Sequence, residues 1–344
     1  MLKKIFRKID EKQMAYSGYS VFYPDTVYFV VNNICNLRCM FCDIGQKNIE
    51  SSFSQILARD DKWITEENVD EIAIKLSGIA KIVHINSTEP ILEKQIYRLI
   101  ASLKKRGALV YMTTGGATLM KRMSEFLESG LDRLYLSIDG PQEIHDVIRG
   151  APGLYGNVTR CIRKIREESN IEVIVPSIVT ENNYTRLFEH AGNMKELGVN
   201  EFYCSHLSFL SEQQMIKQNQ LFPVYSGPAT KFSVENFKSI DFDLMYQQLE
   251  LVKSLNSDNF RTGISPDFTR SNLEKYYVSL DQVSPMEKCN AGSSYIQVLA
   301  NGDVNPMTRC VSSIVFGNIR ENDFHSIWNG KKLRDFRRIV KKQL

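Results

Sequence analysis

Residues 27–42 read VYFVVNNICNLRCMFC, an apolar, β-branched run followed by three closely spaced cysteines. The run predicts a buried strand, and Cys35, Cys39 and Cys42 then lie on the loop that leaves it. Three thiolates this close together can bind three irons of a cubane iron–sulfur cluster and leave the fourth iron open. Three buried small side chains, or a zinc site that lacks its second ligand pair, are the alternatives, and both fit the tight spacing less well.

The composition is that of a soluble globular protein, with 344 residues of which 43% are hydrophobic and 24% are charged. A net charge of +3 is too small to indicate a nucleic-acid or membrane partner. No apolar run approaches the roughly 20 residues of a membrane span, and the basic N-terminus lacks a secretory signal. Seven cysteines, three of them clustered, favour metal ligation in a reducing compartment over disulfides. We therefore expect a cytoplasmic protein.

Beyond the first strand, β-branched runs alternate with helical patterns. Strands are predicted near 27–32, 81–86, 108–113, 133–138, 171–179 and 200–206, and helices near 65–78, 92–105, 117–129, 154–168 and 184–197. Left-handed helix ends are expected at Gly78, Gly107, Gly130 and Gly198. This order predicts an α/β fold with a parallel sheet, a partial (β/α)6 TIM-like barrel, whose reactive face lies at the carboxyl ends of the strands.

Four segments are expected along the chain. They are an N-terminal basic amphipathic helix in 1–24, the barrel in 25–206, a connector and substrate-facing insertion in 207–285, and a small C-terminal α+β domain in 286–344. The N-terminal helix suits a membrane surface or a cover over the barrel. Within the barrel, residues 43–64 are expected to form a long polar loop, either a lid or irregular surface.

The C-terminal segment contains two recognisable patterns. Asn301-Gly302 lies between two apolar stretches and predicts a β-hairpin. A basic helix follows from residue 331, with an apolar stripe that the rest of the molecule can bury. Its charged face suits either solvent or an acidic partner.

The C-x3-C-x2-C spacing, with the aromatic Phe41 directly before the third cysteine, resembles the radical S-adenosylmethionine (SAM) superfamily over residues 25–206. The resemblance implies a 4Fe–4S cluster on Cys35, Cys39 and Cys42, with SAM chelated by the open iron. One electron then cleaves SAM to methionine and a 5′-deoxyadenosyl radical, which abstracts a substrate hydrogen. A reductant such as flavodoxin or ferredoxin is the implied electron donor.

Further residues match motifs of this family. Ser87-Thr88-Glu89-Pro90 stands where the family usually has Gly-Gly-Glu-Pro, which implies that Glu89 binds the SAM ammonium; a helix-start carboxylate is the alternative. The resemblance also makes Phe41, Thr113, Ser137 and Arg149 candidate SAM contacts, although Thr113 could simply belong to a turn. Polar residues 180–183 are expected near the SAM ribose.

The segment from Cys289 to Trp328 resembles the SPASM/twitch domain, which normally binds auxiliary iron–sulfur clusters with four or more cysteines. Here only Cys289 and Cys310 are present, and two cysteines cannot close a cubane. We expect the auxiliary cluster to be lost or incomplete, unless Cys204, a histidine or a substrate atom completes it. Cys204 is alternatively a hydrogen-atom donor to a substrate radical, or a buried structural thiol.

The expected function is hydrogen abstraction from a small molecule such as a sugar, an aminocyclitol or another natural-product intermediate. No peptide-recognition domain fits in the 26 residues before the first strand. One alternative is a radical SAM maturase of a ribosomal precursor peptide. Another is a non-catalytic iron–sulfur or zinc protein, which would need neither Glu89 nor the repeated strand and helix order.

Overall fold

The computed structural model describes residues 10, 12–14, 16–57, 64–86, 88–208, 210–222, 237, 239–280, 289–307, 310 and 312–343. Residues 1–9, 11 and 15 of the expected N-terminal helix, the first residue of the motif Ser87-Thr88-Glu89-Pro90, and part of the expected connector lie outside the described residues. All seven cysteines lie within them.

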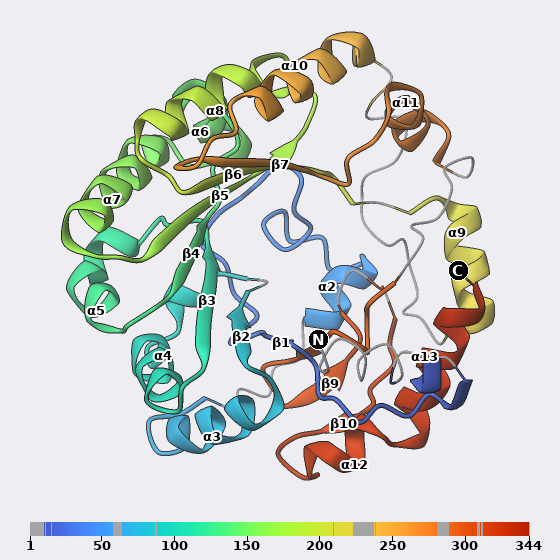
Figure 1. Cartoon of the computed structure of the whole chain (residues 1–344). Coiled ribbons are helices and arrows are strands. Elements are labelled where there is room, and N and C mark those ends of the chain that lie inside the picture. Colours follow the sequence, from blue (N-terminus) through green and yellow to red (C-terminus); the bar gives the residue numbers. More distant parts are fainter. Residues whose placement is uncertain are drawn as a thin grey trace.

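A single curved sheet forms the centre of the described structure (Figure 1). Its strands are β1 Thr26–Phe29, β2 Ile82–Ile85, β3 Leu109–Thr114, β4 Arg133–Leu136, β5 Glu172–Val179, β6 Glu201–His206, β7 Arg261–Ser265, β8 Tyr295–Val298, β9 Asp303–Asn305 and β10 Gly317–Asn318. Their order is β10-β9-β8-β1-β2-β3-β4-β5-β6-β7. Strands β8 and β1 to β7 pair in parallel, whereas β9 and β10 are antiparallel. The α/β class and the partial parallel barrel are confirmed.

The helices of the described part of the chain lie around this sheet (Figure 1). They are α2 Ser52–Leu57, α3 Val69–Ile79, α4 Ile96–Lys105, α5 Met123–Glu128, α6 Gln142–Arg149, α7 Leu154–Glu168, α8 Leu187–Glu196, α9 Glu212–Leu221, α10 Phe242–Ser254, α11 Arg270–Val278, α12 Phe324–Trp328 and α13 Lys331–Gln343. Those from α3 to α8, together with α10, follow the convex side of the sheet (Figure 1). Short 3₁₀ turns are η1 Pro90–Leu92, η2 Leu119–Arg122 and η3 Tyr184–Arg186. None of the helices in the described part of the chain is long and apolar enough to cross a membrane.

The predicted connector continues the barrel. It carries α9, α10, α11 and the seventh parallel strand β7, which pairs with β6. The sequence analysis did not predict β7, because this edge strand exposes both its end residues and has no apolar alternation. Helix α6 was also not predicted, and its last residue, Arg149, proves important for the site.

Two local expectations were wrong. Residues 43–64 are not only a polar loop, because they contain α2, whose Ile56 and Leu57 pack with Val30 and Leu299. Gly78 lies inside α3 instead of ending it. Gly107, Gly130 and Gly198 do have positive φ values of 78°, 77° and 74°, as a left-handed helix end requires.

The C-terminal hairpin extends the barrel sheet. Strand β8 pairs in parallel with β1, and β9 returns antiparallel to β8. The amide of Leu299 donates to the Asp303 carbonyl at 2.9 Å, and Gly302 has a φ of 88°. This is a three-residue hairpin loop with glycine in the left-handed position. The hairpin therefore covers an edge of the barrel that would otherwise expose the unpaired backbone of β1.

Helix α13 does not leave all of its basic side chains in solvent. Arg337 is 2% exposed, and its guanidinium lies 4.0 Å from the centre of the Trp328 ring. It donates to the carbonyls of Gly18 at 2.8 Å and Gly292 at 2.5 Å. One cation of this helix thus joins the N-terminal segment to the C-terminal segment, whereas its exposed neighbours remain solvated.

Buried histidines should make the fold sensitive to acid. His190 in α8 is 0% exposed, its Nε2 bonds the Ile138 carbonyl at 2.9 Å, and its Nδ1 has no partner within the described residues. Burial lowers the pKa of His190 to about 4, so only the unfolded chain takes up a proton between about pH 6.5 and 4. We expect a loss of about 2 kcal/mol in unfolding free energy from His190 on going from pH 7 to pH 5.

Urea unfolding at these two pH values measures the effect. The His190→Gln variant can still donate to the Ile138 carbonyl but does not titrate. It should therefore lose less stability than the wild type at pH 5. Equal pH dependence of the two proteins would contradict the assignment.

Candidate active site

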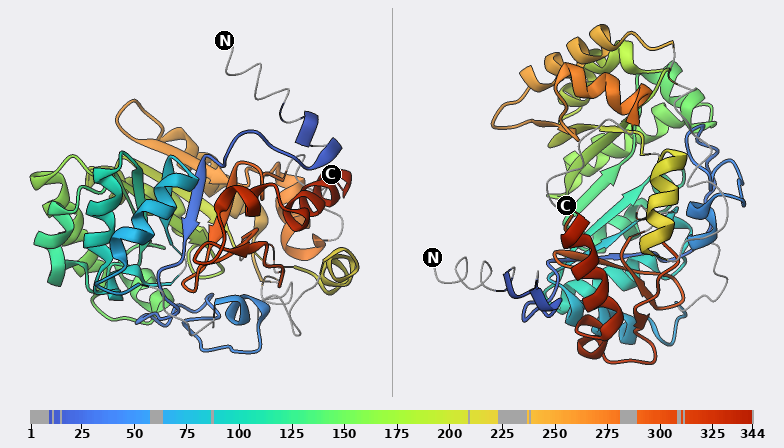
Figure 2. Two further views of the ribbon diagram at one scale, coloured as in Figure 1. Left: turned by 90° about the horizontal axis from the view of Figure 1, so that it is seen from below. Right: turned by 90° about the vertical axis from the view of Figure 1, so that its right-hand side faces the viewer.

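The cysteine loop, residues 34–43, leaves β1 and lies against the C-terminal end of α6. The amides of Arg38 and Met40 donate to the carbonyls of Arg149 and Ile148 at 3.2 and 2.8 Å. Gly150 ends α6 with a φ of 62°, and a Cβ there would lie 2.9 Å from the Arg38 carbonyl oxygen. The loop is therefore positioned by backbone contacts of the folded chain. Figure 2 shows that the neighbouring segment with α2 lies beyond one end of the strands.

The three cysteines of this loop are unpaired. Cys39 is 5% exposed, and Cys35 and Cys42 are half-buried. Burial raises the pKa of Cys39 to about 11, Arg149 opposes this increase, and the neighbouring Cys42 and Cys35 add to it. The Leu37 amide also donates to Cys35 Sγ at 3.5 Å. The three thiols are therefore close enough for the charge of one thiolate to raise the pKa of the next.

A 4Fe–4S cluster fits this donor set. Among the described residues, no three His, Cys, Asp or Glu side chains converge on a single ion. In a 4Fe–4S cluster each thiolate binds a separate iron, so the three sulfurs need not converge. A tetrahedral zinc site would need such convergence and a fourth ligand. The three thiols, together with the Leu37 amide that donates to Cys35 Sγ, therefore suit an iron–sulfur cluster better than a zinc ion.

Glu89 lies beside the cysteine loop, between β2 and η1. It is 1% exposed, and its backbone amide donates to the Ile34 carbonyl at 3.0 Å. Its carboxylate accepts bonds from Thr114 Oγ1 at 2.5 Å, from the Gly115 amide at 2.9 Å and from the Ile91 amide at 3.3 Å. Burial raises the pKa of Glu89, and these donors oppose that increase. A buried carboxylate thus lies at the carboxyl ends of β2 and β3.

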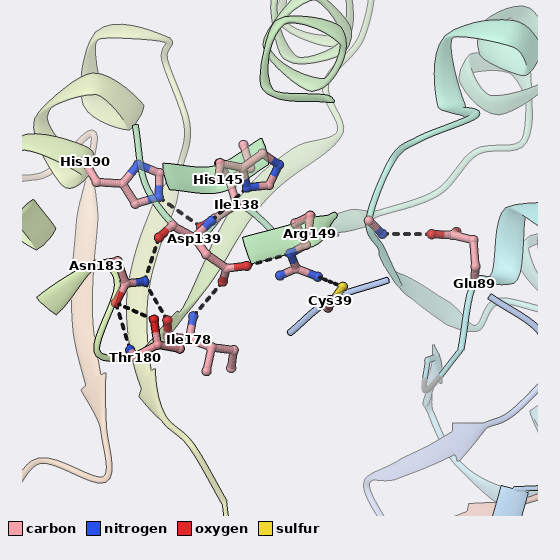
Figure 3. Close-up of polar contacts among 11 residues, drawn as sticks. Cys39, Glu89, Ile138, Asp139, His145, Arg149, Ile178, Thr180, Asn183 and His190 are labelled. Carbon is pink, nitrogen blue, oxygen red and sulfur yellow. Dashed lines mark hydrogen bonds and ion pairs between the residues drawn. The ribbon is translucent and has the colours of Figure 1, made fainter. Parts of the chain in front are cut away.

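Arg149 lies between Asp139 and Cys39 (Figure 3). Its Nε donates to Asp139 Oδ2 at 2.5 Å, its Nη1 donates to Cys39 Sγ at 3.6 Å, and its guanidinium lies 5.3 Å from the Phe41 ring centre. The side chain is only 8% exposed. Burial opposes its charge, but Asp139 and Cys39 raise the pKa of Arg149 above its usual value. Arg149 is therefore a permanent cation beside Cys39.

Residues of β5, of α6 and of the loop after β5 hold Asp139 in place (Figure 3). Its Oδ1 accepts from the Ile178 amide at 2.8 Å, and its own amide donates to His145 Nδ1 at 3.1 Å. Asn183 donates to the carbonyls of Asp139 and Ile178 at 2.6 and 2.7 Å. Asn183 is 1% exposed. Its amide group thus supports Asp139, a role that the sequence analysis, which placed residues 180–183 near the SAM ribose, did not predict.

The other candidate SAM contacts lie at the same end of the barrel. Thr113 is on the interior face of β3, and its hydroxyl bonds His84 Nε2 at 2.8 Å. The adjacent Thr114, which the sequence analysis did not select, is the one that bonds Glu89. Ser137 directly follows β4 and is half-buried. Its backbone amide donates to the Thr114 carbonyl at 3.0 Å.

An aromatic wall lines the barrel interior, and the sequence analysis missed it. Its half-buried members come from five neighbouring strands, and the centres of contacting rings lie 4.8 to 6.2 Å apart. They are Tyr28, His84, Tyr111, Tyr135 and Tyr295. The first residues of β4 to β7 form ion pairs at the opposite end of the strands from the cysteine loop. They are Arg133, Glu172, Glu201 and Arg261. Alternation of aromatic and aliphatic residues along the strands was the available signal.

Cys204 does not face this interior. It lies on the same side of β6 as Phe202, which contacts His190 of α8, and His206, which bonds Tyr277 of α11 at 2.7 Å. Cys204 is 0% exposed, and burial raises its pKa. Its position between the sheet and the helices fits the structural thiol that was one of the two alternatives. Cys161 in α7 is likewise 0% exposed, as expected for a core residue.

Cys289 and Cys310 lie apart from the cysteine loop in sequence but close to each other. Both are half-buried, and burial raises the pKa of Cys310 to about 12, with a further contribution from Cys289. Gln218 of α9 donates to the Cys310 carbonyl at 2.6 Å. These two thiols supply fewer ligands than a cubane needs.

The cysteine loop, Glu89 and Arg149 fit a radical SAM enzyme, and comparison with protein families shows this class. Residues 29–183 match the radical SAM superfamily, and residues 289–344 match SPASM, an iron–sulfur cluster-binding domain. The chain belongs to the radical SAM superfamily and carries a C-terminal SPASM domain. Its cofactors are accordingly a 4Fe–4S cluster and SAM, and the SPASM domain suggests auxiliary iron–sulfur clusters.

Two curated relatives match most of the chain. A "Tungsten-containing aldehyde ferredoxin oxidoreductase cofactor-modifying protein" from Pyrococcus furiosus is 24% identical over 92% of this chain and 84% of its own length. An "Fe-coproporphyrin III synthase" from Methanosarcina barkeri is 22% identical over 86% of this chain and 71% of its own length. The solved structure of Streptococcus suis SuiB bound to S-adenosylmethionine has a TM-score of 0.65 at 15% identity, covering 96% of this chain and 71% of that one. This structural similarity shows the fold.

Proposed function

We propose that this enzyme cleaves SAM at a 4Fe–4S cluster held by Cys35, Cys39 and Cys42 and passes the radical to a ring-shaped small molecule. The meeting of the cysteine loop, Glu89 and Arg149 at the carboxyl ends of parallel strands is the observation that carries this proposal. Ligand sites of parallel α/β folds lie at that end of the strands.

Each group has a defined role in the proposed reaction. When bound, the cluster supplies the electron that converts SAM to methionine and a 5′-deoxyadenosyl radical. Glu89 binds the SAM ammonium through its carboxylate, which the Thr114 hydroxyl and the Gly115 amide hold in orientation. The Arg149 guanidinium lies over the Phe41 ring, so the last residue of α6 contacts the cysteine loop through this side chain as well.

The aromatic wall supports the substrate class. Half-buried tyrosines and a histidine present ring faces to the barrel interior, and such faces bind flat rings, sugar C–H groups or amines. The two curated relatives are named for modifying a cofactor and for making Fe-coproporphyrin III, which are small molecules. A ribosomal peptide is the competing substrate class.

The proposed electron donor is a flavodoxin or ferredoxin, and the proposed location is the cytoplasm. All seven cysteines are unpaired in the described structure. Closely spaced thiols stay reduced in a reducing compartment. In the cytoplasm, a radical SAM enzyme has access to low-potential electron carriers such as flavodoxin and ferredoxin.

The substrate class can be tested with extracts that contain small molecules. We expect anaerobically reconstituted enzyme with dithionite and SAM to form 5′-deoxyadenosine, and a small-molecule extract to accelerate this reaction. The acceleration should survive peptidase treatment of the extract. Tyr135→Ala should keep the basal reaction but lose the acceleration about tenfold, because one stacking surface is removed. Loss of the acceleration after peptidase treatment would instead indicate a peptide substrate.

A further inference from the structure

Arg149 contacts Cys39 of the cysteine loop. Its Nη1 lies 3.6 Å from Cys39 Sγ, whereas the family resemblance implied only that Arg149 contacts SAM. Cys39 is the least exposed of the three cysteines of the loop, at 5%, and Arg149 is 8% exposed. The cation and the sulfur therefore meet where little water screens their interaction.

Such a contact changes the energy of reduction. A one-electron reduction adds a negative charge to the cluster, and a cation that donates to a ligand sulfur stabilises this charge. Asp139 is 0% exposed and lies 2.5 Å from Arg149 Nε. Its negative charge opposes the effect of Arg149 on the cluster, but it also fixes the direction in which the guanidinium points.

The surroundings of Asp139 indicate that its orientation matters. The Ile178 amide occupies Oδ1, and Arg149 occupies Oδ2. His145 and Asn183 hold the backbone of Asp139 from two further segments. A carboxylate fixed from three sides holds one guanidinium against one cluster sulfur (Figure 3).

We propose that Arg149, oriented by Asp139, raises the reduction potential of the 4Fe–4S cluster through its hydrogen bond to Cys39. Arg149 and Asp139 are positioning residues that act through the ligand sulfur. The inference rests on the proposed function in one respect, namely that Cys39 ligates the cluster.

The test is an anaerobic redox titration with dithionite of reconstituted full-length enzyme, followed by electron paramagnetic resonance in the absence of SAM. Arg149→Met should shift the equilibrium toward the oxidised cluster about tenfold, which corresponds to a potential lower by about 59 mV. Arg149→Lys keeps the charge and should recover part of the shift. Asp139→Asn removes the opposing charge and should shift the potential in the other direction. Arg160→Met removes an exposed cation of α7 as the matched control.

Each outcome decides the inference. If the Arg149→Met and Arg160→Met enzymes have the wild-type potential, the inference is wrong. If Arg149→Met weakens only SAM binding, the role of Arg149 is confined to SAM. If Arg149→Met does not fold, the opposite shifts expected of Arg149→Lys and Asp139→Asn still test the inference. A wild-type protein that binds no iron would refute the proposed function instead.

Discussion

The Cys39→Ala enzyme is expected to form at least about 10³-fold less 5′-deoxyadenosine than the wild type. Cys39 is the central cysteine of the loop and the one that Arg149 contacts. Without it, two thiolates of the loop remain, and these cannot hold a cubane with one open iron. Iron and sulfide content, the cluster signal in electron paramagnetic resonance and chromatography of 5′-deoxyadenosine measure the loss.

Cys161→Ala is the matched control for this substitution. Cys161 is also buried, but it lies in α7 and belongs to the apolar core. Its loss should cost about 1 kcal/mol of stability through a small cavity. The iron content and the rate of SAM cleavage should stay close to the wild type. Product formation by Cys39→Ala at the rate of Cys161→Ala would refute the assignment of the ligands.

The sequence was sufficient to predict the parts of the site that are local in the chain. Cys35, Cys39 and Cys42 share one loop, and Phe41 lies among them. The strand before this loop is a β-branched run because both faces of a parallel sheet are buried. The same reasoning located β1 to β6 but missed β7, because Arg261–Ser265 is a short edge strand with exposed ends.

Contacts between distant segments could not be predicted in this way. Arg149 and Cys39 are 110 residues apart in the chain, and their contact depends on where α6 ends against the cysteine loop. Neighbouring side chains of a strand point to opposite faces of the sheet, so a shift of one residue in the register of β6 would turn Cys204 to the other face. The sequence placed Cys204 within the predicted strand 200–206, which corresponds to β6, but did not decide between the interior and the helices.

The site combines two kinds of support. The cysteine loop is held by backbone bonds to Arg149 and Ile148, and Glu89 is held by donors from β3 and its following loop. None of the bonds of the Glu89 carboxylate reaches a cysteine within the described structure. Loss of the Glu89 carboxylate should therefore weaken SAM binding and leave cluster binding close to that of the wild type.

Glu89→Ala tests this separation and should weaken SAM binding by about 30- to 1000-fold, or about 2–4 kcal/mol. The buried carboxylate is the proposed partner of the SAM ammonium, and its removal also leaves the Gly115 amide and the Thr114 hydroxyl without an acceptor. The iron content should stay close to the wild type. Equilibrium binding of SAM to the reconstituted enzyme and iron quantitation measure the two effects.

The Glu89→Gln variant separates charge from shape. Its side-chain carbonyl can still accept from Gly115, so a purely structural role of Glu89 predicts near wild-type SAM affinity, whereas an ionic role predicts an affinity close to that of Glu89→Ala. Burial raises the pKa of Glu89, so protonation should weaken SAM binding as the pH falls, beginning at a higher pH than for a carboxylate in water. Glu89→Gln should lose this part of the pH dependence. If the wild type and Glu89→Gln bind SAM equally well at every pH, Glu89 does not bind the ammonium as a carboxylate.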